Sequence, residues 1–126
     1  MHRFVLLLLA ASLAGLSAAG VSRSSQSVRC PRRALPLTAN SIAPASRVAL
    51  AREKASARPQ VTAAMLARLA GARGDTAKLD CGKRVWQRTV VVFIDLRAYH
   101  PSASLSERVS LVSRLPSGYR VWLIEH

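Results

Sequence analysis

Apolar and polar residues alternate along the last third of the chain. Between residues 86 and 98 every second residue belongs to one face, while the β-branched run at residues 90–94 places apolar side chains on both faces. Such a run is typical of a central strand buried on both sides. Residues 105–115 and 119–126 alternate in the same way. The pattern therefore predicts consecutive antiparallel strands.

A tight hairpin is predicted between the last two strands. Their connection contains a proline that suits the second position of a type I turn, and Gly118 suits the left-handed residue of a bulged loop. This loop places Leu115 opposite Tyr119. The same register places Leu111 opposite Leu123 on the face that we expect to pack against the core.

The other face of this hairpin carries the candidate binding residues. The register places Arg114 directly opposite Arg120, and two like charges so placed cost stability unless solvent or an anion screens them. Trp122 lies beside them, and arginine next to an aromatic platform holds planar anions or stacked bases. The alternative is a solvated face on which arginine stems cover the indole. The candidate set is Arg108, Arg114, Arg120, Trp122 and His126.

The middle of the chain predicts helix before the strands begin. Residues 44–57 are rich in helix formers and lie between two prolines, so a helix is expected there. Residues 60–70 fit an alternating strand and a helical seam equally well, and both remain open. Gly71 and Gly74 are expected to end this element. The prediction is an α+β fold, with one or two N-terminal helices packed on an antiparallel β-meander of three to four strands.

The first residues have the features of a secretory signal peptide. A short basic start precedes an apolar run, and small residues then lead to a cleavage position after Ala19. The predicted organisation is a signal peptide at 1–19, a polar leader or linker at 20–43, with order expected only around Cys30, and a single α+β domain at 44–126. The expected location is secreted or extracytoplasmic. An uncleaved N-terminal membrane anchor is the alternative.

The chain is strongly basic, with 19 Lys and Arg against six Asp and Glu, a formal net charge of +13. Removing residues 1–19 takes away Arg3 and none of the six acids, which leaves +12. Such a charge favours polyanionic partners: anionic envelope polymers, lipid head groups or nucleic acid. A genome whose codon usage favours arginine gives the same charge without any partner.

Two cysteines, Cys30 and Cys81, form an even pair in a small domain that is expected to be exported. Such a pair is more often a disulfide than a reactive thiol. We therefore predict a Cys30–Cys81 disulfide.

The sequence offers no catalytic or metal-binding residues and indicates no cofactor. Asp95 is five residues before His100, so on a continuous strand their side chains would start on opposite faces. The pattern Ser104-x-x-Glu107 matches a helix capping box, but an alternating segment follows it. We expect residues 99–108 to form a corner between two strands, with Leu105 opening the next core face.

Several segments resemble small exported proteins of unknown function from high-GC bacteria. They are Cys81-Gly-Lys-Arg-Val-Trp86-Gln-Arg88-Thr89-Val-Val-Val, Pro101-Ser-Ala-Ser-Leu-Ser106 and Gly118-Tyr-Arg-Val-Trp122. This resemblance covers residues 58–126 and implies no activity or site residues. The final strands also resemble the closing strands of NTF2-like and cystatin-like folds.

Three functions are therefore expected as alternatives. The first is a non-enzymatic exported module that binds an anionic envelope polymer or lipid head groups through the basic and aromatic face, with nucleic acid as a further possible partner. The second is an NTF2-like enzyme or ligand-binding protein with a pocket between sheet and helix. The third is a small structural domain whose charge is compositional.

Overall fold

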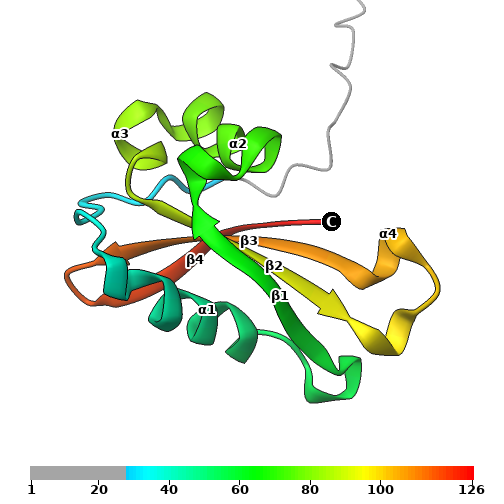
Figure 1. The fold of residues 1–126 in the computed structure, drawn as a ribbon. Helices are drawn as coiled ribbons and strands as arrows, with labels where there is room; N and C mark the ends of the chain where they lie inside the picture. Colours follow the sequence, from blue (N-terminus) through cyan, green and yellow to red (C-terminus); the bar gives the residue numbers. More distant parts are fainter. Residues whose placement is uncertain (1–27) are drawn as a thin grey trace, which may run out of the picture.

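One antiparallel sheet organises the protein (Figure 1). The computed structural model describes residues 28–126, and the predicted signal peptide lies outside them. The four strands follow one another in the order β1-β2-β3-β4, each pairing with the next. Their bounds are β1 Pro59–Leu66, β2 Thr89–Leu96, β3 Glu107–Leu115 and β4 Gly118–Glu125. The predicted α+β fold with an antiparallel meander is confirmed.

Helices cover both faces of the sheet (Figure 1). On one face lies α1 (Ile42–Ala51), whose small side chains Ala45 and Ala49 are fully buried against the strands. On the other face lie α2 (Gly71–Cys81) and the short α3 (Lys83–Trp86). The sheet therefore separates two apolar clusters, an α1-side core and an α2-side core.

The central strand follows directly from its sequence. Thr89 and the three valines after it are all buried, because their alternate side chains enter the two cores in turn. The strand begins at Thr89 instead of residue 86, since the preceding Trp86 ends α3. Residues 60–70, for which strand and helix were both open, form β1 up to Leu66 and then the short helix η3 (Ala67–Leu69).

Helix α2 was not predicted, because its two glycines were interpreted as breakers. Gly71 has φ +56°, a left-handed conformation that turns the chain out of η3 and into the helix. Gly74 is buried against η3, and a Cβ on it would overlap the backbone carbonyl of Ala67. Both glycines therefore build the junction that seats α2 on the sheet.

The predicted register of the final hairpin is correct far from the turn and wrong near it. Leu111 pairs with Leu123 as expected, but Leu115 pairs with Gly118, so the loop has only two residues. Between these pairs the register shifts by one residue at Trp122. A bulge of this kind places neighbouring side chains on one face. Trp122 and Leu123 accordingly both enter the α2-side core.

A compact corner joins β2 to β3, as expected for residues 99–108. It consists of the short helix η4 (Arg97–Tyr99) and one helical turn, α4 (Ala103–Ser106), whose N-cap is Ser102. The capping-box match at Ser104 therefore does not start a helix. Leu105, expected to open a core face, is 60% exposed because it lies in this turn.

The segment before α1 lies against the domain from Val28 onward, passing round one end of the sheet between its two faces (Figure 1). We call residues 28–38 the N-terminal strap. The backbone N–H of Leu35 donates to the carbonyl of Arg114 at 2.7 Å. The predicted disulfide is confirmed, since Cys30 is bonded to Cys81 at the end of α2. The remaining short helices are η1 (Ala39–Ser41) and η2 (Ala55–Ala57).

Candidate functional site

The predicted basic and aromatic face does not form, because the bulge at Trp122 divides it. Arg114 pairs with Tyr119, whose ring packs on the α1-side core. Arg120 pairs with Ser113, whose hydroxyl accepts a hydrogen bond from the Trp122 indole at 3.1 Å. Cross-strand partners share a face. Arg114 and Arg120 therefore lie on opposite faces of the sheet, and the predicted like-charge pair is absent.

The other three predicted binding residues are also separated. Trp122 is 7% exposed and belongs to the α2-side core, so its ring offers no open platform. Arg108 forms an ion pair with Glu53 at 3.1 Å, and the Glu53 side chain is only 4% exposed. His126 is exposed at the chain end, outside β4.

One predicted arginine instead contributes to a hollow beside the disulfide. This hollow has a volume of about 780 Å³, and we call it the basic groove. Its lining combines strap residues with residues of α2, α3, β3 and β4: Val28, Arg29, Cys30, Pro31, Arg32, Cys81, Val85, Leu115 and Arg120. The groove thus brings together Arg120 and both cysteines of the sequence prediction.

The groove is assembled by the N-terminal strap. The disulfide ties Cys30 to the end of α2, and Pro31 beside it is buried. Further along the strap, the Arg88 guanidinium donates to the carbonyl of Ala34. These attachments place Arg29 and Arg32 of the strap at the same hollow as Arg120 of β4. The sequence contained this signal in the run Arg29-Cys-Pro-Arg32, which the prediction did not use.

The charged side chains that line the groove are all basic. The lining includes three arginines and no carboxylate. In the part of the chain that the structure describes, the ion pairs involve other basic residues, so Arg29, Arg32 and Arg120 have no acidic partner within 4.0 Å. Apolar atoms of Val85 and Leu115 share the lining. Such walls lower the local dielectric and strengthen attraction to an anion.

A second hollow lies at the opposite end of the sheet. It has a volume of about 630 Å³ between α2 and the β2–β3 corner, and we call it the corner cleft. Its lining comes from β1, α2, β2, the corner and β3: Thr62, Arg73, Phe93, Ile94, Asp95, His100, Pro101, Ala103, Ser106, Glu107, Arg108 and Val109.

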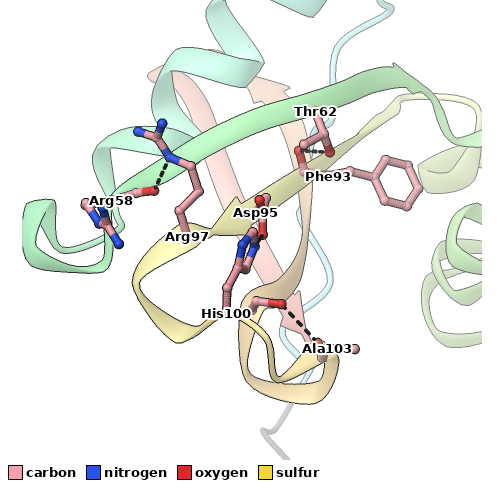
Figure 2. Close-up of polar contacts among 8 residues, drawn as sticks. Arg58, Thr62, Phe93, Asp95, Arg97, His100 and Ala103 are labelled. Atoms are coloured by element: carbon pink, nitrogen blue, oxygen red, sulfur yellow. Dashed lines mark hydrogen bonds and ion pairs between the residues drawn. The ribbon is translucent and has the colours of Figure 1, made fainter.

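The corner cleft contains a hydrogen-bonded pair that the sequence prediction missed. His100 Nε2 lies 2.7 Å from Asp95 Oδ1, and Figure 2 shows the imidazole folded back onto the strand. The expectation that these side chains start on opposite faces is wrong, because β2 ends at Leu96 and η4 turns the chain. Phe93 lies further along the same strand, on the same face as Asp95.

The cleft does not assemble a catalytic triad. The Ser102 and Ser104 hydroxyls contact each other at 3.3 Å, and no serine within residues 28–126 makes a hydrogen bond with His100. Asp95 and His100 are 27% and 52% exposed, so neither is withdrawn from water. Over the same residues, no group of three His, Cys, Asp or Glu side chains is placed to hold a metal ion.

Comparison with known proteins gives no match: no protein-family model, curated protein or solved structure matches the chain. None of the helices in the described chain has the length and apolar character needed to span a bilayer. The disulfide agrees with folding in an oxidising compartment.

Proposed function

We propose that this protein is an exported binding module that holds an anionic partner of the cell envelope in the basic groove. The partner chemistry is a phosphate or carboxylate group carried by an envelope polymer or a lipid head group. The observation that carries the proposal is the lining of the groove, with three arginines and no carboxylate. This proposal moves the anion site from the predicted hairpin face to the disulfide-bonded end of the molecule.

The chemistry of arginine supports this choice of ligand. Each guanidinium presents several N–H donors in a planar fork that matches the oxygen atoms of a phosphate or carboxylate. Arg29 and Arg32 come from a strap held by a covalent bond, and Arg120 comes from a strand. Because both backbone supports are held before binding, only the exposed arginine side chains have to become ordered when an anion enters.

The distribution of charge across the chain also supports the proposal. Two of the described arginines, Arg73 and Arg108, are ion-paired with glutamates. The groove arginines lack such partners, so their charge is available to a ligand. The formal charge of +12 that remains once residues 1–19 are removed raises the local concentration of a polyanion around the molecule, and the groove supplies the contact that retains it.

The test is the salt dependence of binding to a defined polyanion. Purified, disulfide-bonded protein is titrated with polyphosphate, and separately with vesicles containing phosphatidylglycerol, at several salt concentrations. The slope of log K against log salt is about −0.7 to −0.9 for each phosphate neutralised. The triple variant Arg29→Gln, Arg32→Gln and Arg120→Gln should reduce the magnitude of this slope by about 2–3.

A charge-matched variant separates the groove from general attraction. Arg47→Gln, Arg52→Gln and Arg68→Gln remove the same charge from exposed positions outside the groove. Binding by this control should stay within about threefold of the parent, whereas the groove variant should lose at least about tenfold. If the two triple variants lost the same polyanion affinity, binding would depend on the overall charge of the protein and the groove would not be a site.

Single variants distinguish the groove from the sequence-predicted face. Arg120→Gln should weaken binding, because this residue lines the groove, whereas Arg114→Gln should not, because it lies on the opposite face. Preference for polyphosphate over vesicles assigns a polymer partner, and the reverse assigns a lipid head group. Tighter binding to single-stranded nucleic acid than to either probe would reject an envelope partner.

A further inference from the structure

We propose that the corner cleft is a second binding site, which takes a small organic cation: an ammonium group attached to an apolar or aromatic body. This inference does not depend on the anion-binding function of the basic groove. It rests on the cavity, on how charges are paired around it and on one unfavourable contact between strands.

The shape and surface of the cleft suit a small ligand. Its volume of about 630 Å³ lies within the usual range of ligand sites, about 300–1,000 Å³. Phe93 and Val109 contribute apolar surface from two adjacent strands on the α2 side of the sheet, and Pro101 adds apolar surface from the corner. A ligand with a hydrocarbon or aromatic body would bury that body against this wall.

Charge pairing leaves the cleft with a free carboxylate. Arg73 is ion-paired with Glu125 at 3.4 Å, and the Arg108 side chain lies on the other face of the sheet, where it pairs with Glu53 at 3.1 Å. Glu107 has no ion-pair partner among residues 28–126. Three of the six acids of the chain, Asp95, Glu107 and Glu125, thus lie in the cleft or pair with its Arg73, although the chain as a whole is strongly basic.

The free carboxylate lies directly across from another one. Glu107 and Asp95 are cross-strand partners at the junction of β2 and β3. Like charges in this position destabilise a sheet. His100 bonds Asp95 and leaves Glu107 uncompensated. An ammonium group between the two carboxylates would donate charge-assisted hydrogen bonds and remove the repulsion.

Figure 2 shows where two nearby arginines lie relative to Asp95 and Phe93. Arg58 and Arg97 lie on the other side of Asp95 from Phe93, where the Arg97 guanidinium donates to the carbonyl of Arg58 at 3.2 Å. Neither arginine lines the cleft. A ligand that rests on Phe93 would therefore meet the carboxylates and the imidazole before these arginines.

The proposal is tested with three probes of similar shape and different charge: 2-phenylethylamine, 2-phenylethanol and 3-phenylpropanoate. Binding to the intact protein is followed by the amide chemical shifts of Phe93, Glu107 and their neighbours. The protonated amine should bind at least about tenfold more tightly than the alcohol, a difference of about 1.4 kcal/mol, and the anion should bind least. No saturable shift with the amine, or equal affinity for amine and alcohol, would overturn the proposal.

Two acid-to-amide variants locate the site. Glu107→Gln should weaken amine binding about fivefold or more and leave alcohol binding unchanged, since it removes only the charge. The control Asp75→Asn removes the same charge from an exposed position on α2 outside the cleft, and its amine affinity should stay within about twofold. If both variants lose amine affinity equally, or if Glu107→Gln binds the amine as tightly as the parent, the cleft is not the amine site.

The stability of the free protein provides an independent readout. Glu107→Gln removes a like-charge contact, so its melting temperature without ligand should rise while its amine affinity falls. A residue with only a structural role would not move the two measurements in opposite directions. A fall in melting temperature would contradict the repulsion between Asp95 and Glu107 that supports the site.

The two proposed sites can be tested independently. The triple variant of the groove arginines should leave amine binding unchanged, so failure at one site is distinguishable from failure at the other.

Discussion

Replacing Gly74 with alanine tests how tightly α2 is seated. A Cβ at this position would overlap the carbonyl oxygen of Ala67 and lie 2.6 Å from its carbonyl carbon. Carbon atoms rest about 3.5–4.0 Å apart, so the helix must move by about 1 Å. Overpacking of this kind costs about 1–3 kcal/mol, while alanine in a helix returns about 1 kcal/mol relative to glycine. Because the obstacle is backbone, we expect the high end of the cost and a net loss of about 2 kcal/mol.

Urea unfolding of the parent and variant measures this loss as a change in the free energy of unfolding. Asp75→Ala is the matched control, since it places alanine at the next, exposed position and should change stability by no more than about 0.5 kcal/mol. A gain of about 1 kcal/mol in Gly74→Ala, which helix propensity alone would give, would refute the close approach of α2 to η3. Removing the Ala67 side chain should not rescue the variant, because the contact is with its backbone.

Two further predictions concern the supports of the basic groove and of the final hairpin. Reducing the disulfide, which spans 51 residues, should lower the free energy of unfolding by about 4 kcal/mol in the chain-entropy model, as measured by urea unfolding. Titration under reducing conditions should also show weaker polyanion binding. Unchanged polyanion affinity would show that the strap does not build the groove. Trp122→Phe leaves the Ser113 hydroxyl without its indole donor and should lower the free energy of unfolding by about 1 kcal/mol. A variant as stable as the parent would show that this hydrogen bond is dispensable.

The sheet could be predicted from the sequence because its strands carry a clear period of two. The β-branched run of β2 could only be a buried strand, and the pairing of Leu111 with Leu123 followed from alternation. The bulge could not be located in this way. A hairpin accommodates one extra residue at Gly118 or at Trp122 with the same apolar pattern. Burial of Trp122 in the α2-side core, a tertiary effect, determined the outcome.

The candidate sites were less predictable because they depend on irregular segments. The strand rule separated Asp95 from His100, but η4 interrupts the strand between them and brings the two side chains together. The disulfide was predicted from cysteine count, yet its effect on Arg29 and Arg32 depends on the path of the strap, which has no periodicity. Helix α2, with few apolar residues and two glycines, could be recognised only from its contact with η3.

The meander places the two hollows at opposite ends of the same strands. At one end lie Cys81, Leu115 and Arg120 of the groove; at the other lie Asp95 and Glu107. If the proposed function is right, the groove end is the end that faces an anionic surface. The corner cleft would then face away from that surface and stay open to small solutes while the other end of the protein is held.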